Sequence, residues 1–326
     1  MMLTKGYIDL PLDGSLNLAN EIQKLKKEKN AIILAHFYVE AELQEIADYI
    51  GDSLGLSQQA AKTQADMIVF LGVHFMAETA KILSPSKKVI IPDLNAGCSL
   101  ADSCNENDFA KFLAEYPNHT VITYVNTTAK IKAMSDIICT SSNAKFIVES
   151  LPENEKIIFA PDKNLGNYIN SITNRKMVVW DGACHVHHAF SVERLIGLKK
   201  ENPNAKVLAH PECQKPILIL ADFIGSTSEM LNFSKSDACN QFIVATESGI
   251  LHQMQKSSPK KVFIAAPPED ATCACNDCNF MKLNNMQKLY GSLKYEKPEI
   301  HVDEQIRIKA LKPIQRMLDI SAKMKV

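Results

Sequence analysis

The chain contains three copies of one pattern. In each copy a short apolar run ends in polar residues, and a helical stretch, a hydroxyl-bearing turn and a second helix follow. A buried apolar run, a third helix, a last apolar run and a cysteine complete the copy. Short apolar runs that alternate with helical lengths indicate βαβ crossovers and parallel sheets covered on both faces. We therefore predict an α/β protein of three pseudo-symmetric, three-layer αβα domains, each with a short, mainly parallel sheet, around a central active site.

The repeats also divide the chain. Three landmarks recur: His36, Asn126 and His210 at steps of 90 and 84 residues, Ser53, Ser141 and Ser226 at 88 and 85, and Cys98, Cys184 and Cys278 at 86 and 94. A chain of 326 residues is longer than one domain usually needs. We expect domains at 1–117 (with an N-terminal helix), 118–203 and 204–297, and a helical tail at 298–326 that packs on the body.

Polar residues stand at or just past the ends of the expected strands. In parallel sheets, ligands bind beyond the carboxyl ends of the strands. The polar residues at these ends are His36, Tyr38, Tyr124, Asn126, His210 and Glu212. If the three ends converge, they share one central site with the three cysteines. Glu212 is a candidate base, and the two tyrosines would donate hydrogen bonds or pack. The histidines, with His187, would donate to a carboxylate or move a proton, although a lone histidine is more often an ordinary core or surface group.

The cysteines are the strongest chemical signal. The N-terminus lacks the features of a secretory signal, so we expect a cytoplasmic protein whose nine cysteines are thiols or metal ligands. Three thiolates, one per repeat, suit a [4Fe-4S] cluster whose fourth iron stays open to substrate. The alternative is that they are small buried hydrophobes. The run Cys273-Ala-Cys275-Asn-Asp-Cys278 could start a separate metal knot, but no fourth ligand lies near. We assign Cys278 as the ligand and leave Cys273 and Cys275 unassigned. The other four are interpreted as packing residues: Cys104, Cys139, Cys213 and Cys239.

The hydroxyl-bearing turns predict an anion site. Ser53, Ser141, Ser226 and Thr227 are each expected to begin a helix. A single such residue needs no role beyond capping. Three at equivalent positions indicate helix N-termini that converge on an anion. Arginine is scarce and absent from these motifs, so hydroxyls, helix ends and histidines would hold the anion.

Charge and hydropathy exclude some functions. The net charge is −1, with no clustered basic surface, so we expect no nucleic-acid partner. No run approaches the roughly 18 apolar residues of a membrane span. Two alternatives stay open: another iron–sulfur lyase or dehydratase, and a redox or oxygen sensor. A sensor would need a DNA-binding or partner-binding element, and no basic recognition helix is visible.

Together the motifs resemble the quinolinate synthase (quinolinate synthetase A) family. The resemblance runs in order from about residue 30 to about 290 and includes Ala35-His36-Phe-Tyr38, Gly182-Ala-Cys184-His-Val-His187, His210-Pro-Glu212 and Cys278-Asn-Phe-Met-Lys-Leu-Asn284. It implies condensation of iminoaspartate with dihydroxyacetone phosphate to quinolinate, with release of phosphate and water, in NAD biosynthesis. A transient contact with L-aspartate oxidase would accompany this role.

The resemblance also implies residue roles. It places a [4Fe-4S] cluster on Cys98, Cys184 and Cys278. It puts the substrate among His36, Ser53, Tyr124, Asn126, Ser141, His210, Glu212 and Thr227, to which we add Tyr38, His187 and Ser226. Glu212 and a histidine (His36 or His210) would move protons, and Tyr124 would orient an intermediate. The CxCxxC run departs from the CxxCxxC of some family members, so a redox role for that run is not carried over.

Overall fold

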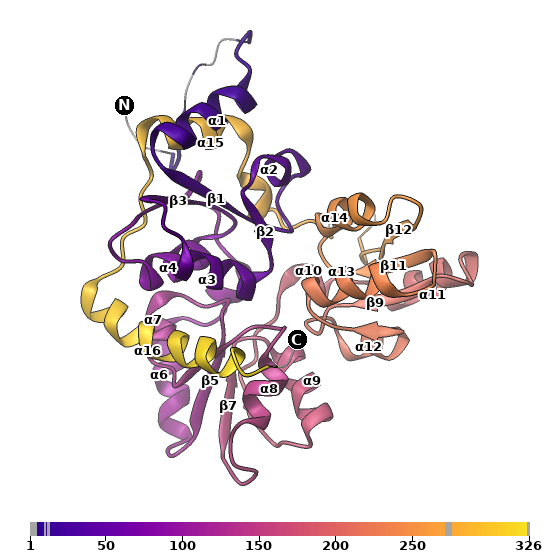
Figure 1. Cartoon of the computed structure of the whole chain (residues 1–326). Coiled ribbons are helices and arrows are strands. Elements are labelled where there is room, and N and C mark those ends of the chain that lie inside the picture. The colour runs from indigo at the N-terminus through magenta and orange to yellow at the C-terminus, as the bar shows by residue number, and fades with distance from the viewer. Residues whose placement is uncertain (1–4, 10, 12–13, 271–275, 325–326) are drawn as a thin grey trace.

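The computed structural model describes the whole chain except residues 1–4, 10, 12–13, 271–275 and 325–326. It contains three four-stranded sheets with the same order, in which the first strand of each repeat lies between the second and the third: β2-β1-β3-β4, β6-β5-β7-β8 and β10-β9-β11-β12. Every strand pair within them is parallel. Figure 1 shows three lobes, each with helices on its sheet. The prediction of three α/β units is confirmed.

In the first unit the strands are β1 (Ala31–His36), β2 (Tyr49–Gly51), β3 (Met67–Leu71) and β4 (Lys88–Ile90). Its helices are α1 (Leu18–Glu28), α2 (Ala41–Ile46), α3 (Ser53–Lys62), α4 (His74–Leu83) and α5 (Ser99–Asp102). The next helix, α6 (Glu106–Glu115), packs on the second unit, where Phe109 shares a core with Val121 and Ile158. Every residue of β3 is buried, as expected for a strand covered on both faces.

The second unit has strands β5 (Thr120–Tyr124), β6 (Ile137–Cys139), β7 (Ile157–Ala160) and β8 (Val178–Val179). Its helices are α7 (Ala129–Lys132), α8 (Ala144–Glu149), α9 (Lys163–Thr173) and α10 (His185–His188). α11 (Val192–Glu201) packs on the third unit, where Leu195 shares a core with Val207 and Ile243. The third unit has strands β9 (Lys206–Ala209), β10 (Phe223–Ile224), β11 (Gln241–Ala245) and β12 (Val262–Ala265). Its helices are α12 (Lys215–Leu220), α13 (Thr227–Ser236), α14 (Ile250–Ser257) and a 3-10 turn (Met281–Leu283).

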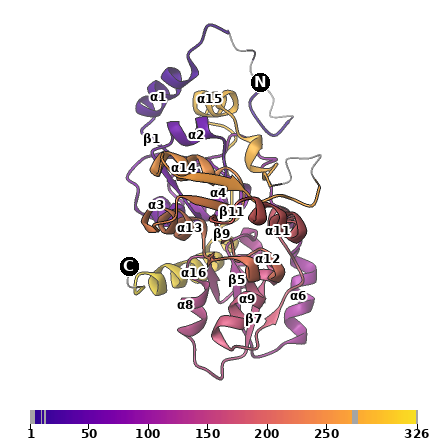
Figure 2. The same cartoon turned by 90° about the vertical axis from the view of Figure 1, so that its right-hand side faces the viewer.

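Two helices close the chain. α15 (Met286–Tyr295) lies against α1, so this part of the range that we placed in the third unit packs on the first. α16 (Glu304–Ser321) packs on α4 of the first unit and on α7 and β6 of the second. Figure 2 views the molecule from the side of the third unit and shows α1 and α15 next to each other again.

The second strand of each sheet was not expected from the sequence. β2, β6 and β10 are only two or three residues long, which is too short to produce a distinct apolar run. An aspartate before each of them reaches back to the first strand: Asp48, Asp136 and Asp222 accept the backbone N–H of Ile33, Val121 and Val207 at 2.8, 2.8 and 2.7 Å. These three bonds show how closely the units repeat.

The strand register corrects one alignment of the repeats. Ala35 pairs with Leu71, Thr123 with Ala160, and Ala209 with Ala245. The next residues, His36, Tyr124 and His210, are therefore equivalent, at steps of 88 and 86 residues. Our alignment of His36 with Asn126 was wrong by two residues, because both Tyr124 and Asn126 are polar and the apolar run alone does not fix where the strand pairing ends.

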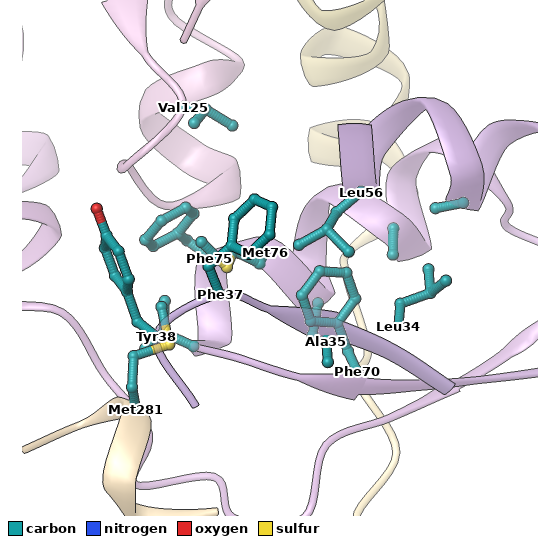
Figure 3. Close-up of a cluster of buried hydrophobic side chains, with 14 of the residues drawn as sticks. Leu34, Ala35, Phe37, Tyr38, Leu56, Phe70, Phe75, Met76, Val125 and Met281 are labelled. Carbon is teal, nitrogen blue, oxygen red and sulfur yellow. The ribbon is translucent and has the colours of Figure 1, made fainter. Parts of the chain in front are cut away.

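A buried apolar cluster supports the strand ends of the first unit. Figure 3 shows Phe37, Phe75 and Met76 packed together, with Val125 of the second unit nearby. Tyr38 lies at the edge of this cluster, and its hydroxyl oxygen points away from the labelled apolar side chains. The ring is thereby fixed by packing while its polar end is free to bond elsewhere.

Candidate active site

One pocket is lined by side chains from all three units. It contains every site residue predicted from the sequence except Ser226: His36, Tyr38, Ser53, Cys98, Tyr124, Asn126, Ser141, Cys184, His187, His210, Glu212, Thr227 and Cys278. Phe75, Met76 and Met281 supply part of its apolar wall. The carboxyl ends of the three sheets thus meet at one central cavity, where parallel sheets bind their ligands.

The strand ends place their side chains by the same geometry in each unit. His36, Tyr124 and His210 directly follow the equivalent paired positions, and the pocket residues Tyr38, Asn126 and Glu212 come two positions later. The second residue of each pair lies in the turn or bend that directly follows the strand. Six polar groups from sequence-distant strands are thereby gathered in one place.

The hydroxyl turns follow the same register. Gly51 pairs with His36, Cys139 with Tyr124, and Gly225 follows the last pair of β10. The equivalent residues two positions later are Ser53, Ser141 and Thr227, which all line the pocket.

The turns differ in how they meet their helices. Ser53 and Thr227 are the first residues of α3 and α13, whereas Ser141 lies in the turn before Asn143, the N-cap of α8, so it does not begin that helix. Ser226 does begin a helix, but it is fully buried and caps α13, accepting the N–H of Glu229 in a capping box. The sequence spacing did not separate Ser226 from its neighbour Thr227, since both carry a hydroxyl.

Two histidines are held as neutral hydrogen-bond donors. The Nδ1 atom of His36 accepts the N–H of Tyr38 at 3.2 Å, and that of His210 accepts the N–H of Glu212 at 3.4 Å. Burial lowers the pKa of His36 to about 4 and that of His210 to about 3. Each neutral ring therefore carries its proton on Nε2, which in His210 lies 3.1 Å from the Ser141 hydroxyl.

Glu212 is a buried carboxylate with several partners. Its Oε2 lies 2.8 Å from Nδ1 of His187, and the Tyr124 hydroxyl donates a hydrogen bond to it. Burial alone would raise the pKa of Glu212, but the electrostatic interactions with the His187 and His210 rings and the hydrogen bond from Tyr124 oppose it and lower the pKa. The side chain is therefore ionised at neutral pH, beside a nitrogen that can share a proton.

A chain of hydroxyls connects the first and third units behind this pair. His187 Nε2 lies 2.9 Å from Thr246 Oγ1, which lies 2.7 Å from the Tyr38 hydroxyl, and the latter lies 2.8 Å from Thr227 Oγ1. Thr246 was not predicted from the sequence. In the sequence we looked for polar residues just past the first strand of each repeat. The same search past the third strand would have found Thr246 and the pocket residue Glu247, which follow β11.

Three more polar side chains line the pocket: Asn126, Thr140 and Glu247. Buried Asn126 Oδ1 and Thr140 Oγ1 have no hydrogen-bond partner among the described residues, and both residues line the pocket. Unpaired buried polar atoms are costly, so these sites fit a polar ligand. Burial raises the pKa of Glu247 to about 7, against the opposing charge of Lys282.

The donor set at the centre is three thiols, one from each unit. Cys98, Cys184 and Cys278 line the same pocket, form no disulfide, and lie close enough to influence one another electrostatically. Burial raises the pKa of Cys98 to about 12 and that of Cys278 to about 11, and the pKa of Cys184 is raised as well. Buried thiols that resist ionisation need a cation to become thiolates, so this set fits a group that brings iron.

A different set of atoms could hold a single ion. One ligand atom each from Cys184, His187 and Glu212 lies within 4.8 Å of the others. His187 Nε2 already bonds to Thr246 Oγ1 at 2.9 Å, whereas its buried Nδ1, 2.8 Å from Glu212 Oε2, makes no hydrogen bond of good geometry among the described residues. Cys184 belongs to both this set and the three-thiol set, so the two could not each hold a separate ion through it.

Four other cysteines of the described part of the chain do not line the pocket. Cys104, Cys139 and Cys213 are buried, and Cys239 is half-buried. Cys273 and Cys275 lie outside the described residues. Among the residues that the structure does describe, no helix combines the length and apolar character needed to cross a lipid bilayer.

Three α/β units that converge on thiols, neutral imidazoles and a buried carboxylate define an enzyme with a metal-competent, polar pocket. Comparison with known proteins identifies the family. Residues 20–319 match the model of the quinolinate synthetase A protein family. The quinolinate synthase of Thermosynechococcus vestitus is 59% identical over 312 residues, which cover 96% of this chain and 97% of that protein. The quinolinate synthase of Chloroherpeton thalassium is 58% identical over 312 residues, which cover 95% of this chain and 97% of that protein. The chain belongs to the quinolinate synthetase A family.

Proposed function

We propose that the chain catalyses the quinolinate synthase reaction, the condensation of iminoaspartate with dihydroxyacetone phosphate to quinolinate, releasing phosphate and water. It would be a transferase-type step with dehydration and ring closure in NAD biosynthesis. The observation that carries the proposal is the convergence of one cysteine from each unit on a pocket that also holds donors for anions. The names of the relatives support the same reaction.

The pocket suits two anionic substrates, a dicarboxylate and a phosphate ester. Ser53, Ser141 and Thr227 offer one hydroxyl per unit, and two of them stand in the first turn of a helix, where backbone N–H groups are unpaired. Neutral His36 and His210 add Nε2–H donors without adding charge. With Tyr38 and Asn126, these groups would bind carboxylate and phosphate oxygens and hold the two carbon skeletons in contact.

Cys98, Cys184 and Cys278 would hold a [4Fe-4S] cluster. When bound, it would leave one iron free of protein ligands to act as a Lewis acid on substrate oxygen or nitrogen. The condensation is redox-neutral, so polarisation of a bond is all that it requires of the iron.

Proton transfer falls to the carboxylate and the imidazoles. Glu212 is ionised and buried, so it can accept a proton from carbon or nitrogen of the bound substrate and share it with His187 at 2.8 Å. His36 and His210 would hydrogen-bond through Nε2–H to the oxygen atoms that leave as water or phosphate, and the proton that Glu212 has accepted would pass to those oxygens. The Tyr124 hydroxyl, bonded to Glu212, would fix the orientation of the ring that forms.

The test uses full-length protein purified without oxygen. We expect iron and sulfide in the ratio of a four-iron cluster and formation of quinolinate from the two substrates. Serine variants of Cys98, Cys184 and Cys278 should lose both cluster and turnover, whereas Cys104→Ser, at a buried position outside the pocket, should keep them. A cluster-containing protein that forms no quinolinate but dehydrates another hydroxy acid would favour the lyase alternative.

We further propose a cytoplasmic location, because thiols that serve as iron ligands need a reducing compartment. Iminoaspartate would come from L-aspartate oxidase through a transient contact. A product-formation assay with the two enzymes together, in the presence and absence of an iminoaspartate trap, checks this contact. Equal sensitivity to the trap with coupled enzymes and with free iminoaspartate would argue against it.

A further inference from the structure

Two of the three units carry a buried carboxylate at the same position of the sheet. Asp162 and Glu247 both lie two residues beyond equivalent strand positions, Ala160 of β7 and Ala245 of β11, and both are 0% exposed. Neither is a site residue that the repeats or the motifs predicted.

Each carboxylate divides its two oxygens in the same way. In Asp162, Oδ1 accepts the N–H of Leu165 at 2.8 Å and Oδ2 accepts the N–H of Cys184 at 3.2 Å. In Glu247, Oε2 accepts the N–H of Gly249 at 2.7 Å and Oε1 accepts the N–H of Cys278 at 3.1 Å, and Oε1 also lies 3.3 Å from Lys282 Nζ, a contact that Asp162 does not have. One oxygen therefore binds the turn that follows the strand, and the other binds the backbone of the pocket cysteine.

The first unit uses another solution. Its equivalent residue is Val73, which is apolar and 2% exposed and cannot accept a hydrogen bond. The loop that leads to Cys98 is tied instead by the main chain, because the N–H of His74 donates to the carbonyl of Ala96 at 2.7 Å. The strand-to-cysteine connection is thus present in all three units, but only two of them make it with a side chain.

The chemistry explains why a carboxylate stands there. Burying a carboxylate costs free energy unless its oxygens are hydrogen-bonded. An amide of similar size would offer one acceptor oxygen and one NH₂ group, and the NH₂ would face a backbone N–H. A carboxyl side chain has an oxygen for each of the two backbone donors, and an amide does not.

We propose that Asp162 and Glu247 are positioning residues that fix the backbone of Cys184 and Cys278 to the ends of their sheets. Cys98 is fixed without such a residue. The inference concerns the placement of the thiols and rests on the proposed function only in that these thiols would hold the cluster. Loss of one carboxylate should therefore affect one cysteine, not all three.

The experiment measures the three cysteines separately. Asp162→Asn and Glu247→Gln are compared in full-length protein, first by the rate of cluster release to an iron chelator. After removal of the cluster, the alkylation rate of each cysteine by iodoacetamide is then followed by peptide mass spectrometry. Matched controls are Asp136→Asn and Asp222→Asn, which alter aspartates that accept backbone N–H groups of β5 and β9 at the opposite end of the same sheets.

We expect the rate of cluster release to rise by about 10-fold, the lower end of the usual effect of losing a group that orients a metal ligand. Alkylation should rise selectively at Cys184 in Asp162→Asn and at Cys278 in Glu247→Gln, with wild-type rates in both controls. Glu247→Asp retains the carboxylate, but the shorter side chain does not reach both donors, so this variant should behave like Glu247→Gln. It replaces Glu247→Gln in the test if that variant does not fold. Wild-type rates, or an equal rise at all three cysteines, would overturn the proposal. The alkylation pattern is informative even if the protein forms no quinolinate.

Discussion

Replacement of Glu212 by glutamine tests the base that we assign to the pocket. The substitution keeps the size of the side chain and its hydrogen-bonding capacity but removes the charge that lies 2.8 Å from His187 Nδ1. The glutamine can still accept from Tyr124, so the pocket should keep its shape. What it loses is the ability to take a proton from the bound substrate.

The magnitude follows from these contacts. General base catalysis typically contributes about 10²- to 10⁴-fold, which corresponds to about 3 to 5.5 kcal/mol of transition-state stabilisation. Exchange of a charged for a neutral acceptor in the contact with His187 should cost about 1 kcal/mol of stability. Removal of a buried charge offsets part of that loss. Turnover should therefore fall far more than stability.

The assay is quinolinate formation by variants that contain the cluster, without oxygen, with iron content and thermal midpoint measured on the same samples. Glu229→Gln is the matched control, because Glu229 lies outside the pocket and its role in the capping box of α13 is one that glutamine also fills. We expect a loss of at least about 100-fold in kcat for Glu212→Gln and little change in the control. Near-normal turnover of Glu212→Gln would remove this carboxylate from the mechanism and move the role to His36 or His210.

Three further predictions concern the neighbourhood of the pocket. Ser226→Ala should lower the thermal midpoint by removing an N-cap worth about 1 kcal/mol, whereas Thr227→Val should lower turnover more than stability; the reverse pattern would contradict the register. Because the pKa values of His36 and His210 are lowered to about 4 and about 3, the unfolded chain binds more protons below pH 6.5. The two histidines therefore lower stability as the pH drops from about 6.5 to about 4, while the raised pKa of Glu247 acts in the opposite direction. The thermal midpoint of His36→Gln should respond to acid less unfavourably than that of the wild type; equal slopes would refute this. Gly249→Ala should cost about 1 to 3 kcal/mol, since a Cβ there would lie 2.8 Å from main-chain atoms of the loop after β1, and an unchanged midpoint would contradict it.

The sequence by itself determined the architecture and the family. Hydrophobic runs are local, and a strand buried on both faces, such as Met67–Leu71, is visible as an unbroken apolar segment. Polar residues at the ends of such runs indicated where a site would form, because parallel sheets bind ligands at that edge. The three cysteines stood out for the same reason, since each follows the last strand of its repeat.

Only the tertiary structure decided which polar residues are equivalent and which side chains meet. Pairing between strands distant in the sequence aligned Tyr124, not Asn126, with His36, and gave the pocket position to Thr227, not Ser226. A shift of one residue along a strand reverses the face of its side chain, and composition cannot detect such a shift. The bonds from Asp162 to Cys184 and from Glu247 to Cys278 join residues 22 and 31 positions apart, and they exist because the fold brings the end of one strand beside the loop that follows the next.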